Sequence, residues 1–185
     1  LSSNAHVDLQ PALVGRGRRL RRWRERWLLE VRVGAMLMTA DLPTNDAGEK
    51  IVRIGHSPDP DDAFMFHALT TGAFPTPGYV FGHELQDIET LNHRAMNSEL
   101  EVSAVSIHAF PDIADRYALM NCGASMGEGY GPMIIAKPGV TEEEARASPI
   151  AVPGLKTSAY LGLRLAWGDV PIEVVPFDEI MPGVI

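Results

Sequence analysis

The sequence contains a single cysteine, Cys122, and this scarcity excludes two kinds of structure. One cysteine cannot form an intrachain disulfide, and it cannot build a cysteine-cluster metal site. Free cysteine behaves as a small hydrophobic side chain and is among the residue types most often found inside proteins. We therefore expect a buried thiol at Cys122.

Long apolar runs are also missing. No window of the chain approaches the roughly 18 consecutive apolar residues of a membrane-spanning helix, so we expect no membrane-embedded role. Hydrophobic residues still make up 45% of the 185 residues. This content is enough to bury a substantial core, either in one large domain or in two small lobes.

Positive charge is scarce after residue 35 and concentrated before it. Residues 1–35 carry eight arginines and three acidic residues, whereas residues 36–185 carry 8 basic and 21 acidic residues. The arginines would suit a nucleic-acid arm or a basic membrane-surface helix. The pair Arg21 and Arg22 could also indicate a twin-arginine export signal, but no apolar segment of about 7 to 15 residues follows it.

We favour the interpretation that residues 1–35 form a basic leader outside the functional domain, because targeting and processing segments are easily mistaken for structure. Met36 and Met38 stand where the composition becomes ordinary, and either is a candidate start site. We accordingly expect no nucleic-acid partner and no membrane partner. The lack of a secretory signal peptide favours a cytoplasmic location.

From Lys50 onward, patterns typical of strands and helices alternate. Strands are expected at residues 51–55, 79–85, 102–106, 117–120, 133–136, 150–152 and 172–175. Helices are expected at residues 62–71, 87–97, 107–115 and 158–167, with further starts at residues 142 and 178. In the first helix we expect Phe64, Ala68 and Leu69 to form the apolar face, and in the second Ile88, Leu91 and Ala95.

This alternation predicts an α/β fold with a largely parallel sheet covered on both faces. We expect a first lobe at residues 50–136 and a partial second lobe at residues 137–185. Ligands in such folds lie at the carboxyl ends of strands, facing helix N-termini. Three turns meet that description, at residues 57–62, 106–109 and 154–159.

The turn at residues 154–159 has the donors that an anion requires. Thr157 and Ser158 offer hydroxyl groups, the helix that they open offers unpaired N–H groups, and Lys156 adds a positive charge. A carboxylate or a phosphate would fit these groups. A plain N-cap, which stabilises a helix by about 1 kcal/mol, also explains these residues and is the favoured interpretation of the turn taken alone, because every helix start needs such groups.

The turn at residues 57–62 has acidic residues that could bind a metal. Asp59, Asp61 and Asp62 lie close in sequence to His56 and His67, and hard cations prefer oxygen ligands. Their spacing matches no calcium loop, and acidic residues at a helix start are favoured by the helix dipole. We therefore favour helix capping over a metal site, and we expect no metal.

The remaining candidates are weaker. His83 lies in an expected strand and His93 in an expected helix, so each is interpreted as an ordinary surface or half-buried residue. His108 follows an expected strand end, where an imidazole could act as an acid or base. The glycine-rich run at residues 123–132 matches no nucleotide-binding fingerprint, and it favours close backbone approach or a hinge.

Six segments, in this order, give the chain a resemblance to a known family. They are SPDPDDAFMFHAL (57–69), DIETLNHRA (87–95), VSAVSIHAF (102–110), YALMNCGASMGEGYGP (117–132), IAVPGLKTSAYLGLRLA (150–166) and FDEIMPGV (177–184). Together they resemble the 1,4-dihydroxy-6-naphthoate synthase family, which acts in the futalosine route to menaquinone. The family also has a chorismate-dehydrating relative.

The resemblance implies the two-lobed type II fold of periplasmic solute-binding proteins, incomplete in this chain. It implies a carbon–carbon lyase that needs no cofactor and converts cyclic dehypoxanthinylfutalosine, a carboxylate, to 1,4-dihydroxy-6-naphthoate. It assigns substrate binding to the end of one strand and to the start of one helix. The residues so assigned are Ala104, Val105, Ser106, Thr157, Ser158 and Ala159.

The same resemblance places the catalytic base elsewhere. The family's proposed base is a histidine in an Ile-His-Glu motif beyond the equivalent of Val184, so we expect it after Ile185 and not at His108. We expect no turnover from these 185 residues alone. The family commonly has Ser-Pro-Cys-Pro-Asn-Asp where Asp59, Asp61 and Asp62 occur, and a lysine in place of Ala104. A non-catalytic solute-binding protein for a small carboxylate, and the chorismate-dehydrating relative, are the alternatives. The oligomeric state is not indicated.

Overall fold

The computed structural model describes residues 5–7, 30–37, 41–127, 129 and 131–184. It divides into two compact units. The first unit comprises Val31–Ser125, and the second comprises Met126–Ile185 together with Leu1–Glu30. The boundary between the units, after Ser125, precedes the expected lobe boundary at residue 136. The strand that contains Ser125 ends close to this residue, so the first unit ends there. Each unit is described by itself.

A five-stranded sheet forms the centre of the first unit, in the order β4-β3-β5-β2-β6. β3 (Lys50–His56), β4 (Tyr79–Leu85) and β5 (Val102–Ser106) occur where the sequence predicted strands. β3 pairs in parallel with β4 and with β5. The carboxyl ends of these three strands therefore lie at the same edge of the sheet.

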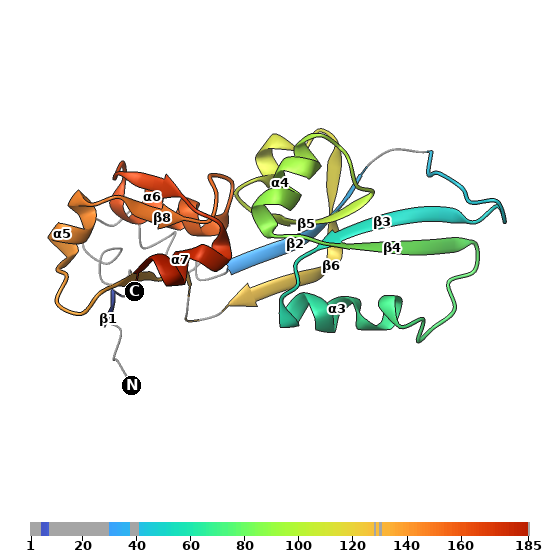
Figure 1. Cartoon of the computed structure of the whole chain (residues 1–185). Coiled ribbons are helices and arrows are strands. Elements are labelled where there is room, and N and C mark those ends of the chain that lie inside the picture. The colour runs from blue at the N-terminus through green and yellow to red at the C-terminus, as the bar shows by residue number, and fades with distance from the viewer. Residues whose placement is uncertain (1–4, 8–29, 38–40, 128, 130, 185) are drawn as a thin grey trace. The chain divides into compact units, whose positions relative to one another are not determined.

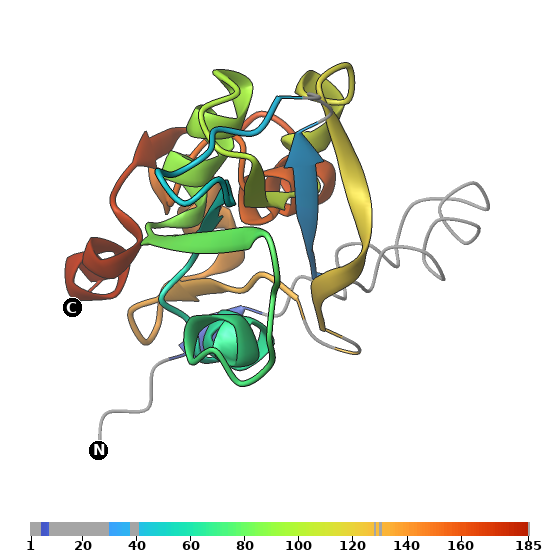
Figure 2. The same cartoon turned by 90° about the vertical axis from the view of Figure 1, so that its right-hand side faces the viewer.

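β2 (Glu30–Leu37) makes the sheet mixed, whereas a largely parallel sheet was expected. It pairs antiparallel with β5, with Gly34 opposite Ala104 and Arg32 opposite Ser106. Figure 2 shows blue β2 beside the yellow β6 (Tyr117–Gly127). Residues 30–35 of the expected leader thus belong to the sheet. Residues 8–29 and Met38 lie outside the described residues, so the leader itself stays a prediction.

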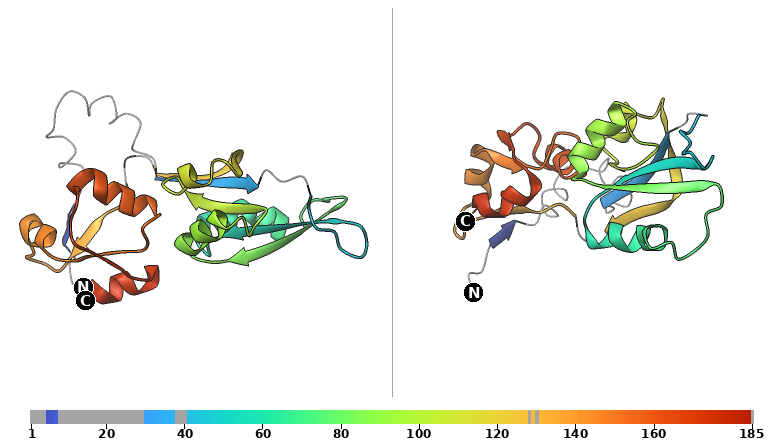
Figure 3. Two further views of the ribbon diagram at one scale, coloured as in Figure 1. Left: turned by 90° about the horizontal axis from the view of Figure 1, so that it is seen from above. Right: turned by 45° about the vertical axis from the view of Figure 1, so that its right-hand side comes forward.

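Two helices lie on opposite sides of the sheet strands, as Figure 1 and the right-hand view of Figure 3 show. α4 (Ile88–Met96) begins at its cap Asp87, whose side chain accepts from the Thr90 N–H. A Cβ atom at Gly55 in β3 would lie 2.5 Å from Leu91 Cδ2 and from Leu100 Cδ1. Glycine at this position therefore allows α4 to approach the sheet closely.

α3 (Pro60–Thr70) lies on the other side of the sheet, and its packed face differs from the expected one. Phe66 and Leu69 pack against the buried residues of β3 and β5, whereas Phe64 is 87% exposed. The prediction that Phe64 is buried was therefore wrong. The buried face is fixed by Asp62, which is buried and bonded to Ser57, so Phe64 is turned toward solvent.

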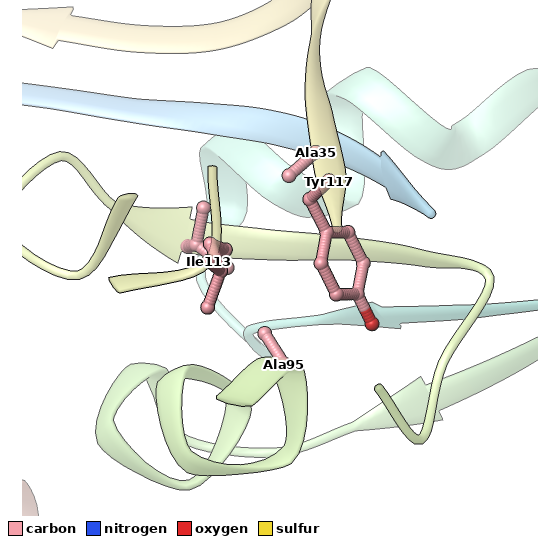
Figure 4. Packing of buried hydrophobic residues seen from close by; sticks show 5 residues of the cluster. Ala35, Ala95, Ile113 and Tyr117 are labelled. Carbon is pink, nitrogen blue, oxygen red and sulfur yellow. The ribbon is translucent and has the colours of Figure 1, made fainter. Parts of the chain in front are cut away.

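The core on the α4 side of the sheet joins four elements of the unit. Ala35 of β2, Ala95 of α4, Val105 of β5, Ile113 and Tyr117 form one buried cluster (Figure 4). The Tyr117 hydroxyl donates to the Leu100 carbonyl over 2.7 Å, so this phenol is buried with its hydrogen bond satisfied. Burial raises the pKa of the Tyr117 hydroxyl.

Two further expectations need correction in this unit. The helix expected at residues 107–115 is only a 3₁₀ turn, Phe110–Asp112, which Pro111 permits at its first positions.

Cys122 is exposed, not buried as predicted. It lies in β6, which is longer than expected and is the edge strand of the sheet, so no neighbouring strand covers one side of it.

The second unit is built on a parallel pair, β8 (Ile150–Val152) and β9 (Ile172–Val174). Ala145 of α5 (Glu142–Ala147), Val152 and two residues of α6 (Ser158–Trp167), Leu163 and Trp167, form its buried cluster. α7 (Phe177–Val184) follows β9. β7 (Ile134–Ala136) pairs antiparallel with β1 (Ala5–Val7).

In the part of the chain that the structure describes, no helix is both long enough and apolar enough to cross a bilayer.

Candidate functional site

The turn between β3 and α3, Ser57–Asp62, is closed by hydrogen bonds among its own residues. Asp62 is 1% exposed, and its Oδ2 accepts from the Ser57 N–H at 2.7 Å and from the Ser57 hydroxyl at 2.9 Å. Asp59 occupies the N-cap position but makes no side-chain bond to the helix. Its carboxylate is bonded to the Ser57 hydroxyl instead. These carboxylates therefore fix the turn, in place of the simple capping that we expected.

Two histidines support the same end of β3. His56 is buried, its Nε2 lies 3.1 Å from His83 Nδ1, and its Nδ1 lies 3.2 Å from the Ser57 carbonyl oxygen. The His56 ring also stacks on Phe66, with the centroids 4.5 Å apart. Burial lowers the pKa of His83, and the neighbouring His56 lowers it further. Among the described residues, no group of three or more His, Cys, Asp and Glu could hold a metal ion.

The end of β5 is buried in the sheet. Ala104, Val105 and Ser106 are 7%, 0% and 2% exposed. The side chain of Asn92, on α4, holds this strand end by two hydrogen bonds. Asn92 Oδ1 accepts from the Ser106 N–H at 2.8 Å, and Asn92 Nδ2 donates to the Ser106 hydroxyl oxygen at 3.2 Å.

Asn92 was missed by the sequence analysis, although a signal for it was present. With Ile88, Leu91 and Ala95 it completes the i, i+3, i+4, i+7 spacing of the buried face of α4. A polar residue at a position of that face must find partners inside the protein. His108, the candidate acid or base, follows β5 directly and is half-buried.

The turn between β8 and α6, Gly154–Ala159, belongs to the second unit. Thr157 is the N-cap of α6 and is 3% exposed. Its hydroxyl donates to the Gly154 carbonyl at 2.8 Å and accepts from the Tyr160 N–H at 3.2 Å. The Thr157 side chain therefore serves the helix start.

Ser158 differs from its neighbour Thr157. Its hydroxyl oxygen is buried and has no hydrogen-bond partner among the residues that the structure describes. The first N–H groups of an α-helix lack intrahelical acceptors, and in α6 these include those of Ser158 and Ala159. One unsatisfied hydroxyl and the positive end of a helix dipole are thus brought together, which is an arrangement that favours an anion.

The six residues assigned to substrate binding therefore fall into two groups. Ala104, Val105 and Ser106 lie in the first unit, and the other three lie in the second. Within each group the structure brings the predicted residues together. Two hydroxyls, those of Ser106 and Ser158, have hydrogen-bonding capacity left for a ligand, whereas the hydroxyl of Thr157 is used within the protein.

Comparison with known proteins gives consistent matches. A family model described as menaquinone biosynthesis matches residues 52–185. A protein of Thermus thermophilus named 1,4-dihydroxy-6-naphtoate synthase is 38% identical over 134 residues, which is 72% of this chain and 48% of that protein. A Streptomyces coelicolor protein of the same name is 37% identical over 139 residues, with the same two shares.

A solved structure also matches. The crystal structure of a protein from Archaeoglobus fulgidus has a TM-score of 0.67 and 44% sequence identity, and the match covers 72% of this chain and 49% of that one. The chain thus spans about half the length of the curated relatives that it matches. The matched family segment, residues 52–185, includes both groups of site residues. This chain belongs to the menaquinone biosynthesis family.

Proposed function

We propose that the chain is part of a 1,4-dihydroxy-6-naphthoate synthase, a carbon–carbon lyase that converts cyclic dehypoxanthinylfutalosine to 1,4-dihydroxy-6-naphthoate. The single observation that carries this proposal is the 37–38% identity to two proteins of that name over 72% of this chain. We further propose the two-lobed fold of periplasmic solute-binding proteins and a cytoplasmic location. The division of the chain into two compact units supports the fold.

The site residues have distinct roles in this proposal. The substrate carries a carboxylate, and the Ser158 hydroxyl with the N–H groups at the start of α6 would bind it, because this hydroxyl has no partner among the described residues and the first N–H groups of a helix lack intrahelical acceptors. In the first unit we assign the Ser106 hydroxyl at the end of β5 to the substrate, and the buried Ala104 and Val105 hold this strand end in the core. Thr157 acts indirectly by fixing the helix start, since its hydroxyl is already bonded on both sides.

The reaction requires no cofactor in this proposal. We assign no catalytic base to His108, because its position after β5 does not correspond to the Ile-His-Glu motif of the family. Ala104 stands where the family commonly has a lysine, so a cation at the end of β5 is replaced by a methyl group. Substrate recognition at this strand end then depends on the neighbouring Ser106 hydroxyl.

The test is turnover by the protein expressed from its complete gene, with Ser158→Ala as the decisive variant. A hydrogen bond to a charged group is worth about 1.5–3 kcal/mol, so we expect KM for cyclic dehypoxanthinylfutalosine to rise by about tenfold or more. Ser148→Ala is the matched control, because Ser148 is an exposed serine whose hydroxyl bonds to the Glu144 carbonyl at the end of α5. The control should leave KM unchanged.

Other outcomes would redirect the proposal. Tight binding of the substrate without naphthoate product, by the complete and folded protein, would favour a solute-binding protein for a small carboxylate. Dehydration of chorismate in place of naphthoate formation would favour the chorismate-dehydrating relative. An unchanged KM for Ser158→Ala, with normal turnover, would show that the start of α6 does not bind the substrate.

A further inference from the structure

We propose that Asn92 is a positioning residue that fixes the direction of the Ser106 hydroxyl, so that its proton is presented to an acceptor group of the substrate. This inference rests on the proposed function, because it assigns a role to a residue behind the binding site. It concerns the buried hydrogen bonds between α4 and the end of β5. Asn92 itself would not touch the substrate.

The orientation of the Asn92 amide follows from the chemistry of its partners. The Ser106 backbone N–H can only donate, so the oxygen of the amide must face it, and these atoms lie 2.8 Å apart. The amide nitrogen must then face the Ser106 hydroxyl oxygen, at 3.2 Å. That nitrogen also lies 3.4 Å from Glu89 Oε2, which accepts its second proton.

The direction of the serine hydroxyl follows in turn. An amide N–H₂ group has no lone pair to offer, so the Ser106 oxygen accepts from Asn92 and cannot donate to it. Its proton must point to another acceptor. Among the described residues, Asn92 is the one hydrogen-bond partner of this hydroxyl, and the residue is 2% exposed. An acceptor group of the incoming substrate would supply the missing partner.

Burial makes this arrangement rigid. Asn92 is 0% exposed. Its amide oxygen accepts from the Ser106 N–H, and its amide nitrogen donates one proton to the Ser106 hydroxyl and the other to Glu89. Reversing the hydroxyl would leave a buried N–H₂ proton without an acceptor, which is unfavourable. The serine is therefore held as a donor before the ligand arrives, and preorganised donors bind with less loss of entropy.

The substitution Asn92→Asp tests the inference, because aspartate keeps the shape of asparagine but replaces the N–H₂ donor with an oxygen that accepts. In Asn92→Asp, one carboxylate oxygen can still accept from the Ser106 N–H, while the other accepts the hydroxyl proton and turns it away from the ligand. In the protein from the complete gene, we expect KM for cyclic dehypoxanthinylfutalosine to rise by about tenfold. kcat should change less than KM.

The introduced negative charge could weaken binding of an anion by itself, so two comparisons isolate the hydroxyl. Asn97→Asp places the same charge at the exposed C-cap of α4 and should leave KM unchanged. The decisive comparison repeats Asn92→Asp in a Ser106→Ala background, where no hydroxyl remains to be turned. There the further rise in KM should be less than about twofold, because the two residues act through one contact.

The outcomes separate this inference from the proposed function. If Ser106→Ala alone leaves KM unchanged, Ser106 does not bind the substrate, and the assignment of this strand end fails together with the inference. If Ser106→Ala raises KM but Asn92→Asp raises it by the same factor with and without the serine, the inference alone is wrong. Should Asn92→Asp fail to fold, the same cycle with Asn92→Ala decides, because that variant frees the hydroxyl to rotate.

Discussion

Two segments of this protein share the order strand, polar turn and helix but differ in their hydrogen bonding. In the β3–α3 turn, Ser57–Asp62, the Ser57 N–H and hydroxyl are bonded to the carboxylates of Asp59 and Asp62 in the same turn. The β8–α6 turn, Gly154–Ala159, satisfies Thr157 in the same way but leaves the Ser158 hydroxyl without a partner among the described residues. Abundant polar residues at a turn therefore do not identify a ligand site. Unused hydrogen-bonding capacity is the feature on which the proposed anion site at the start of α6 rests.

The comparison also explains why the acidic turn is structural. Asp62 is buried because it accepts two hydrogen bonds from Ser57, and this bonding closes the turn before α3. A carboxylate used in this way has less capacity for a cation or a substrate donor. The β8–α6 turn has its unpaired hydroxyl at the positive end of a helix dipole, which favours an anion.

The largest expected effect tests the internal closure of the β3–α3 turn. Asp62→Ala removes the carboxylate that accepts from the buried Ser57 N–H, while the Ser57 hydroxyl can still donate to Asp59. We expect the free energy of unfolding to fall by about 2–3 kcal/mol. Urea titration followed by circular dichroism measures it. Asp61→Ala is the matched control, because Asp61 is exposed and bonded to Ser125 at the surface, and it should cost about 1 kcal/mol or less. Equal losses for the two variants would show that the turn is not closed by Asp62.

A smaller effect should separate two adjacent residues of the β8–α6 turn. Thr157→Ala removes the N-cap of α6, and we expect it to lower the free energy of unfolding by about 1–2 kcal/mol. Ser158→Ala removes a buried hydroxyl without a described partner, so stability should stay the same or rise slightly. Both are measured by urea titration without ligand. A loss for Ser158→Ala as large as that for Thr157→Ala would mean that the Ser158 hydroxyl is bonded in the free protein.

Much of the fold was predictable because hydrophobic periodicity and capping act locally. The strands at Tyr79–Leu85 and Val102–Ser106 and the helix at Ser158–Trp167 have the predicted bounds. Alternating or continuous apolar residues mark such strands, and Thr157 is a typical N-cap. Both signals depend on a few neighbouring residues, so they can be read without knowledge of tertiary contacts.

The errors arose where tertiary contacts decide the outcome. Phe64 has the spacing of an apolar face, but Phe66 and Leu69 are the residues that pack against the sheet. Cys122 is exposed because β6 is an edge strand, which no local pattern reveals. The antiparallel insertion of β2 between β5 and β6 was equally hidden, since pairing between strands distant in sequence depends on the whole sheet.

The candidate site was predictable in its residue types but not in its bonding. The sequence indicated hydroxyls at Ser106, Thr157 and Ser158, and the resemblance assigned all three to substrate binding. Only coordinates distinguish a hydroxyl that is already bonded on both sides, as in Thr157, from one that retains capacity, as in Ser158. Asn92 could have been suspected from its place on the buried face of α4, but its partner Ser106 lies 14 residues away.

The smallest expected effect is a pH dependence of the free energy of unfolding, caused by His83 beside the carboxyl end of β3. This strand end leads into the β3–α3 turn. His83 has a pKa lowered by burial and by the adjacent His56, so the folded protein favours the neutral imidazole. As the pH falls below about 6.5, the unfolded chain binds a proton at this residue before the folded protein does, and the free energy of unfolding decreases. Because His83 keeps partial exposure, we expect a loss of about half a kcal/mol or less.

His83→Phe should remove this contribution while keeping an aromatic ring beside His56 and Phe66. The measurement is the urea unfolding free energy of both proteins at pH 8 and at pH 5.5. Between pH 8 and pH 5.5 we expect the free energy of unfolding to fall less in the variant than in the wild type, because phenylalanine has no proton to bind. A difference between the two proteins that is the same at both pH values would show that protonation of His83 does not weaken the end of β3, and that the β3–α3 turn depends on the bonds of Asp62 alone.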